Sequence, residues 1–341
     1  MKKVLSFFMF MSLALSLQSV SAVTTLKVHH FLPAASSFNV RVIQPWCDKV
    51  AKESNGDLVC QIYPSMQLGG TPPQLVDQVK DGVVDIVWVI PTHAAGRFTK
   101  SEVFELPFLT SSAKQGSQAL WEYVQNNALD EYKGIKLLFM HTTEGYVLHS
   151  NKQVKTLEDL KGMKIRSATR INAKLISALG ATPVQMPLPS VSDSISKGVI
   201  DAAMVPWEAL PATKIHEIVK YHLDAPVSGP RFSNSIFMFG MNQAKYDSLS
   251  PSQKKVIDNN SGLSTSAWAG ATGYDAIVEP YVKMAKDRNN TISYLSTAEF
   301  QRWAKASDHV DDDWVKEANA KGAEGKKLLE DARNLLKKYE K

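Results

Sequence analysis

Hydrophobic and polar positions follow the same order at two places in the chain, about 116 residues apart. Residues 80–89 (KDGVVDIVWV) and residues 196–205 (SKGVIDAAMV) each pass from a polar helix end, through a glycine, into a short apolar stretch. A helix that stops at glycine and leads into a continuous apolar strand is typical of a strand–helix–strand crossover in a buried parallel sheet. Two such units predict two similar α/β lobes, and two lobes enclose a cleft.

The chain before the first repeat predicts alternating strands and helices. Residues 33–37 (PAASS) indicate a turn whose serines cap the next helix, which places Val42, Trp46 and Val50 on one face. Strands are predicted over residues 26–31, 58–63 and 83–90. This order implies a doubly wound α/β lobe.

The remaining pattern predicts a second lobe and a return to the first. Strands over residues 136–141 and 146–149 carry the chain out, and a strand over 232–241 brings it back. Helices dominate after about residue 251, with one more strand near 292–295. We therefore expect a multi-stranded hinge. Lobe I is predicted to hold residues 23–145 plus about 231–270, lobe II residues 146–230 plus about 271–305, and C-terminal helices residues 306–341.

The first 22 residues have the pattern of a secretory signal peptide. Lys2 and Lys3 precede a mostly apolar stretch over residues 4–17, and Val20-Ser21-Ala22 offers small residues for cleavage. A membrane anchor is disfavoured, because the apolar stretch is shorter than the roughly 20 residues that a spanning helix needs. The mature chain is expected in the periplasm.

Charge and cysteine content narrow the class of partner. The chain has 39 Lys and Arg against 34 Asp and Glu, and no basic cluster with interleaved aromatic residues, so no nucleic-acid partner is expected. Cys47 and Cys60 lie on a helix and on the following strand, which are expected to pack together. A disulfide and two buried free thiols are both compatible with this placement.

The chain shows none of the common motifs for catalysis or metal binding. H-E-x-x-H, C-x-x-C, an Asp-rich calcium loop and G-x-S-x-G are absent, and no Lys-Ser/Thr follows Gly69-Gly70 as a phosphate loop requires. We therefore expect no cofactor, no metal and no enzymatic activity. The alternative, a secreted α/β enzyme acting on a small acid, would need an acid/base pair or a nucleophile in the cleft.

Several short segments resemble the substrate-binding proteins of tripartite ATP-independent periplasmic (TRAP) transporters, the DctP-like family. They are Tyr63-Pro64 with Gln67-Leu68-Gly69, Glu105-Leu106-Pro107-Phe108, LKGMKIR at 160–166, LGATP at 179–183 and GVID at 198–201. The resemblance implies an α/β, two-lobed periplasmic binding protein fold with a hinge and a long bracing helix. It also implies capture of a small organic acid, delivery to the membrane subunits of a TRAP permease, and a monomer. Coupling to a periplasmic sensor is an alternative.

The resemblance places an arginine that pairs with the ligand carboxylate at Arg166. A planar guanidinium presents two parallel donors that fit a carboxylate. Family members that bind sialic acid or other polyhydroxy acids have polar or charged residues at four cleft positions where this chain has apolar or aromatic ones. These positions are Phe31, Ile90, Tyr146 and Val205.

An apolar pocket with one carboxylate clamp predicts an aromatic or apolar monocarboxylate of the benzoate, aryl-acetate or aryl 2-oxo acid type. A C4-dicarboxylate or a sugar acid is the alternative. Trp207, which follows a strand of the second lobe, is predicted as a stacking wall. Further candidate ligand contacts are Trp88, Leu188, Arg97, Arg170 and His30.

Overall fold

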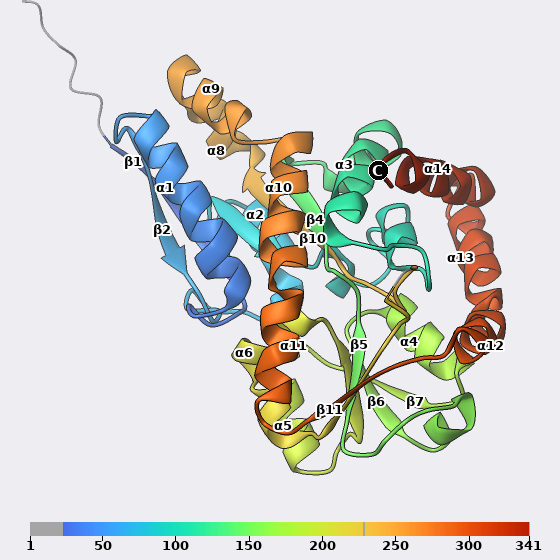
Figure 1. The fold of residues 1–341 in the computed structure, drawn as a ribbon. Helices are drawn as coiled ribbons and strands as arrows, with labels where there is room; N and C mark the ends of the chain where they lie inside the picture. Colours follow the sequence, from blue (N-terminus) through green and yellow to red (C-terminus); the bar gives the residue numbers. More distant parts are fainter. Residues whose placement is uncertain (1–22, 228, 341) are drawn as a thin grey trace, which may run out of the picture.

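A computed structural model describes residues 23–227 and 229–340. The predicted signal peptide, residues 1–22, lies outside the described residues. The described part of the chain forms two sheets with helices around each of them, one above the other in Figure 1.

The first sheet has the strand order β2-β1-β3-β10-β4. The strands β1, β2 and β3 are parallel, whereas β10 runs antiparallel to β3 and β4. Their bounds are β1 Thr24–His30, β2 Leu58–Tyr63, β3 Ile86–Val89, β4 Ile135–Thr142 and β10 Ile236–Asn242. All five lie in the two ranges proposed for lobe I.

The second sheet has the order β11-β9-β5-β8-β6-β7, and its antiparallel strand is β5, which pairs with both β8 and β9. The bounds are β5 Val147–Ser150, β6 Lys164–Ser167, β7 Thr182–Gln185, β8 Ala202–Val205, β9 Tyr221–Asp224 and β11 Thr291–Tyr294. These strands lie in the ranges proposed for lobe II.

Helices cover both sheets, and two groups of helices reach from one lobe to the other. The helices beside the first sheet are α1 Gln44–Glu53, α2 Leu75–Lys80, α3 Ala113–Asn127, α8 Gln243–Ser248 and α9 Pro251–Asn259. Those beside the second sheet are α4 Arg170–Ala178, α5 Val191–Ser196, α6 Leu210–Thr213 and α7 Ile215–Ile218.

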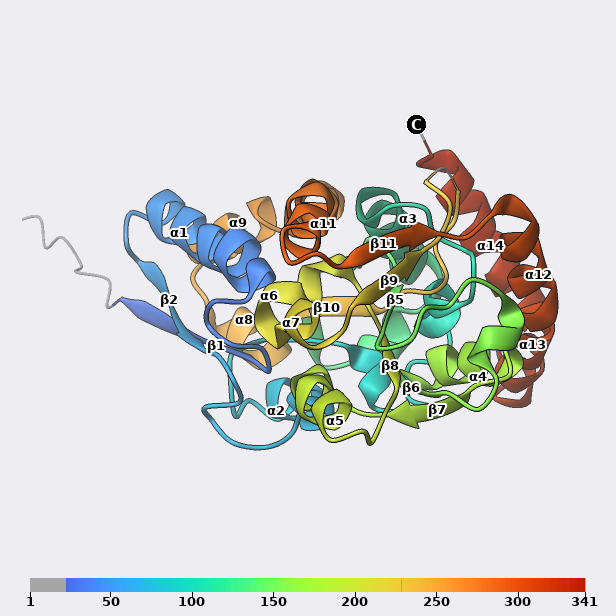
Figure 2. The same ribbon diagram turned by 60° about the horizontal axis from the view of Figure 1, so that its bottom comes forward.

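The first bridging group is α10 (Leu263–Gly273) and α11 (Val278–Lys286), which follow one another along the molecule in Figure 1. The second is α12 (Thr297–Ser307), α13 (His309–Ala320) and α14 (Gly325–Lys338), gathered at one end in Figure 2. Within it, α14 packs on α3 and α13 packs on α4. The long helix expected from the resemblance is therefore interrupted between Gly273 and Val278.

The repeated sequence pattern forms the same local structure in both lobes. Gly82 and Gly198 end α2 and α5 with φ of 74° and 68°, a conformation that glycine adopts at little cost. Three residues after each glycine, an aspartate accepts a hydrogen bond from a backbone N–H of the neighbouring strand. Asp85 accepts from Lys27 N at 2.8 Å, and Asp201 accepts from Lys164 N at 2.8 Å. The predicted repeat is thus a structural repeat.

The start of the first helical segment differs from the prediction. The Ser36 and Ser37 hydroxyls make no hydrogen bond to described residues, and a π-helical turn (Asn39–Ile43) precedes α1. The backbone N–H of Phe38 donates instead to the carboxyl oxygen Oε1 of Glu208, at 3.2 Å, in the other lobe. The cap therefore comes from a residue 170 positions away, which a local pattern cannot reveal.

Cys47 of α1 and Cys60 of β2 form a disulfide with a Cα–Cα distance of 5.6 Å. The sequence was compatible with a disulfide or with two free thiols, and the structure contains the disulfide. No helix among the described residues is long and apolar enough to cross a membrane.

Candidate functional site

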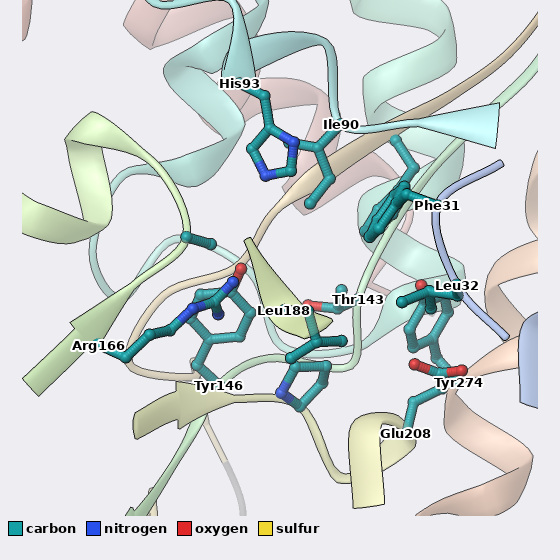
Figure 3. Close-up of a pocket in the computed structure, with 13 residues that line it drawn as sticks. Phe31, Leu32, Ile90, His93, Thr143, Tyr146, Arg166, Leu188, Glu208 and Tyr274 are labelled. Carbon is teal, nitrogen blue, oxygen red and sulfur yellow. The ribbon is translucent and has the colours of Figure 1, made fainter. Parts of the chain in front are cut away.

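A cavity lies between the two lobes, where the carboxyl ends of β1 and β3 face those of β6 and β8 (Figure 3). This edge is where open α/β sheets bind ligands. The cavity encloses about 390 Å³ of space free of protein atoms, part of it open to solvent. Its lining comes from lobe I (Phe31, Leu32, Ile90, His93, Thr143 and Phe237), from lobe II (Tyr146, Ala168, Arg166, Leu188, Pro206 and Glu208) and from Tyr274 between α10 and α11.

Arg166 of β6 is a buried cation whose described surroundings hold no acidic partner. Its side chain is 2% exposed, and no carboxylate of the described residues lies within 4.0 Å of it. Nε donates to the Met186 carbonyl at 3.0 Å and Nη1 to the Met204 carbonyl at 3.1 Å. These two bonds fix the plane of the guanidinium and leave Nη2 without a backbone partner, beside the Tyr146 phenol. Burial lowers the pKa of Arg166, but an arginine remains charged.

Tyr146 stands beside this guanidinium at the start of the second lobe. Its phenol is 2% exposed and shares a hydrogen bond with the Ser235 hydroxyl. Burial raises the pKa of Tyr146 to about 12, so the phenol keeps its proton and can donate to an anion. Arg166 and Tyr146 together form a donor group at one end of the cavity (Figure 3).

The walls between the polar groups are apolar. Phe31 and Ile90 follow β1 and β3 and are 3% and 5% exposed, and Leu188 closes the lobe II side. Phe31 stacks on Trp88 with ring centroids 5.6 Å apart and planes 11° from parallel. A flat ring thus has a rigid aromatic surface against which to pack.

The structure brings together five of the predicted contact residues, Phe31, Ile90, Tyr146, Arg166 and Leu188, and places six elsewhere. Trp88 is fully buried behind Phe31, stacked on Phe38 at 4.5 Å and on Phe237 at 4.8 Å. It supports the wall without forming its surface.

Trp207 and Val205 are also core residues. The Trp207 indole N–H donates to Asp224 at 3.0 Å, and its ring packs against His149 and His222. Val205 is 0% exposed in the same cluster. The prediction of Trp207 as a stacking wall does not agree with this geometry, because the Asp224 hydrogen bond holds the indole under the second sheet.

The other predicted polar contacts have partners of their own. Arg170 at the start of α4 forms ion pairs with Glu102 and Glu317, and Arg97 pairs with Asp77 at 2.7 Å on the surface. His30 hydrogen-bonds Asn39 at 3.1 Å, and burial lowers its pKa to about 4. None of the three side chains lines the cavity.

Four polar residues of the cavity were not among the predicted contacts, namely His93, Thr143, Glu208 and Tyr274. Both ring nitrogens of His93 are buried without a hydrogen-bond partner among described residues, and burial together with the Arg166 charge lowers its pKa to about 3. The signal available in the sequence was position: His93 and Glu208 each follow a strand that ends at the cleft. Tyr274 lies between two helices and carries no such signal.

A metal site has no support in the described part of the chain, where no group of three or more His, Cys, Asp or Glu residues is placed to hold an ion.

Comparison with known proteins gives one family and several solved structures. The sequence profile of the bacterial extracellular solute-binding proteins of family 7 matches residues 29–317. The 2,3-diketo-L-gulonate-binding periplasmic protein YiaO of Escherichia coli K12 is 27% identical over 66% of this chain and 65% of its own.

Two similar crystal structures are of TRAP solute-binding proteins. One, from Rhodoferax ferrireducens T118 with copurified benzoate, is 43% identical with a TM-score of 0.91, covering 93% of this chain and 99% of that one. The other, from a marine metagenome, is specific for aromatic acid ligands and holds 3-hydroxybenzoate. It is 44% identical with a TM-score of 0.92, covering 94% of this chain and 100% of that one.

Proposed function

This chain belongs to the bacterial extracellular solute-binding proteins of family 7, and we propose that it captures an aromatic monocarboxylate in the periplasm and delivers it to a TRAP permease. The observation that carries the proposal is Arg166, a buried guanidinium without an acidic partner among the described residues, at one end of an apolar cavity. Two solved relatives support it, since one holds copurified benzoate and the other is specific for aromatic acid ligands.

The charge of Arg166 favours an anionic ligand. Burying an unpaired cation costs several kcal/mol, and a carboxylate that accepts two parallel N–H bonds offsets that cost. The Tyr146 phenol adds a neutral donor to the same end. The proposed role of this pair is therefore to hold the carboxylate.

The walls favour an aromatic body over a polyhydroxy one. Burying a ring of about 150–250 Å² is favourable by roughly 4–6 kcal/mol at about 25 cal/mol per Å², before ordering costs. A sugar acid would leave hydroxyls unpaired against Phe31, Ile90 and Leu188, at about 1–3 kcal/mol each. A dicarboxylate would need a second cation, and Arg166 is the sole Arg or Lys among the described residues that line the cavity.

The family is one of binding proteins, and we propose that the ligand leaves chemically unchanged. The close pairing of two lobes around the cavity suits capture and release to a membrane partner. Finding genes for a large and a small membrane subunit beside this one would support a permease, and finding a sensor kinase there would favour the sensing alternative. A monomeric state remains our expectation.

The direct test is Arg166→Gln, measured by isothermal titration with benzoate. We expect an affinity loss on the order of 100-fold or more, because the carboxylate would lose its charged partner in a desolvated site. Arg97→Gln is the matched control, since Arg97 pairs with Asp77 on the surface and should leave affinity unchanged. Unchanged benzoate affinity in Arg166→Gln, with a normal circular dichroism spectrum, would refute the clamp.

A further inference from the structure

The end of the cavity away from Arg166 is polar, although the walls between are apolar. Figure 3 shows Glu208 and Tyr274 on the side opposite the guanidinium, with Leu188 and Thr143 between. Neither residue is needed to hold a carboxylate. A carboxyl group and a phenol in this position require an explanation of their own.

Glu208 has one carboxyl oxygen committed and one available. It lies in the short turn Trp207–Ala209 after β8 and is 2% exposed. Oε1 accepts the backbone N–H of Phe38 at 3.2 Å, whereas Oε2 makes no hydrogen bond to any residue that the structure describes. Because Glu208 lines the cavity, this second oxygen can accept a hydrogen bond from a group inside it.

Tyr274 presents the complementary group. Its ring is held by Phe38 at 5.5 Å and His141 at 5.2 Å, and the residue is 1% exposed. Its hydroxyl makes no hydrogen bond within the described ranges, although the residue lines the cavity. Most buried tyrosine hydroxyls have a partner. The cavity is therefore the place from which that partner would come.

We propose that Glu208 and Tyr274 form a subsite for a hydroxyl group on the ligand ring, so that the preferred ligands are hydroxylated aromatic acids. The inference rests on the proposed function, in which Arg166 holds the carboxylate. A phenolic hydroxyl would donate a hydrogen bond to Glu208 Oε2 and accept one from the Tyr274 hydroxyl. Each of the two unpartnered groups would then have the partner its chemistry requires.

The position of the subsite selects the position of the hydroxyl. Because Glu208 and Tyr274 lie opposite Arg166, the group they recognise is on the meta or para carbon. An ortho hydroxyl lies beside the carboxylate, at the Arg166 end. The subsite thus predicts discrimination among three isomers of equal size and composition.

The test compares ligands as ratios within each protein, by isothermal titration of the full mature chain. The probes are benzoate, the three hydroxybenzoates, and 3- and 4-methylbenzoate, which match the hydroxyl in size but cannot donate a hydrogen bond. In the wild type we expect 3- or 4-hydroxybenzoate to bind about tenfold more tightly than benzoate and the matching methylbenzoate. We expect no such gain for 2-hydroxybenzoate.

Two independent variants remove the two groups. Glu208→Gln keeps a carbonyl oxygen for the Phe38 N–H, and Tyr274→Phe deletes a hydroxyl that makes no bond within the described protein. In each, we expect the hydroxybenzoate-to-benzoate affinity ratio to fall to about threefold or less. Tyr246→Phe, which removes a surface hydroxyl bonded to Asp258, is the matched control and should keep the wild-type ratio.

The outcomes separate the two proposals. Failure of the wild type to bind benzoate or any hydroxybenzoate would overturn the proposed function itself. Binding of benzoate with no meta or para advantage in the wild type would overturn the hydroxyl subsite alone. An advantage that survives in either variant would overturn it as well.

Discussion

The buried carboxyl of Glu208 lines the cavity and also forms a hydrogen bond between the two lobes. It contacts the start of the lobe I helical segment through Phe38 and stands at the polar end of the cavity. Burial raises its pKa from 4.5 to about 7, because a carboxylate loses hydration there. Its protonation state therefore depends on folding.

This shift predicts a pH dependence of stability. Between pH 4.5 and about 7 the folded protein binds the Glu208 proton and the unfolded chain does not, so stability falls as pH rises through that window. Between pH 4.5 and 8 the free energy of unfolding of the wild type should fall by about 3 kcal/mol relative to that of Glu208→Gln. Urea unfolding of the ligand-free proteins checks this, with Glu279→Gln on the exposed surface of α11 as control. If the free energies of unfolding of the wild type and Glu208→Gln differ by the same amount at every pH in this range, burial does not raise the pKa of Glu208.

Arginines four positions apart show what sequence could and could not predict about the site. The family resemblance singled out Arg166, which the structure places in the cavity. Arg170 was a further candidate contact, because it lies just before a predicted helix. Its partners Glu102 and Glu317 are 68 and 147 residues away, and only the fold brings them together. Long-range ion pairs of this kind leave no local pattern.

At the scale of elements, strands and helices with regular apolar patterns were predictable to within a few residues. The strand predicted over residues 83–90 is β3, Ile86–Val89, because residues after Gly82 turn before pairing with β1. The strand β9 was not predicted. Its His222 and Asp224 are polar but buried, and they find partners in His149 and Trp207 from distant segments.

The disulfide links two elements, α1 and β2, and a stability prediction follows from it. The bond joins residues 13 apart, and closing a loop of that length stabilises a fold by about 3 kcal/mol in the chain-entropy account. The double variant Cys47→Ala/Cys60→Ala should lower the free energy of unfolding by about that amount. It should leave benzoate affinity unchanged, because neither cysteine lines the cavity.

Chemical denaturation of the double variant and of the wild type with and without a reducing agent measures the effect. The reducing agent should destabilise the wild type and leave the variant unaffected. Equal stability of wild type and variant under oxidising conditions would contradict the prediction.

At the scale of the whole molecule, the two lobes are joined by paired crossing segments and by contacts around the cavity. Thr143 N donates to the Ser235 carbonyl at 3.3 Å and Tyr146 N to the Ser233 carbonyl at 2.9 Å, where the chain passes between the sheets. The Arg170–Glu102 pair and the Glu208–Phe38 bond also span the lobes. These two contacts hold lobe I against lobe II on either side of the crossing segments.

The two-lobe architecture was predictable because its sequence pattern is local and occurs twice. In each lobe a glycine follows the helix, and an aspartate follows the glycine three residues later. Only some of the cavity-lining residues were predictable, because neighbouring large side chains compete for the position that faces the cavity. Phe31 faces the cavity and Trp88 stacks behind it, an order that composition and strand position do not determine.

Capture of an aromatic monocarboxylate is tested by a thermal-shift screen of the mature protein, which is first unfolded, stripped of copurified ligand and refolded. The panel is benzoates, aryl-acetates, aryl 2-oxo acids, C4-dicarboxylates and sugar acids. A ligand at about 1,000 times its Kd stabilises by about 4 kcal/mol, which moves the midpoint by several degrees. We predict that aromatic monocarboxylates raise the midpoint and sugar acids do not. A shift by dicarboxylates or sugar acids alone would contradict a cavity with one carboxylate clamp and apolar walls.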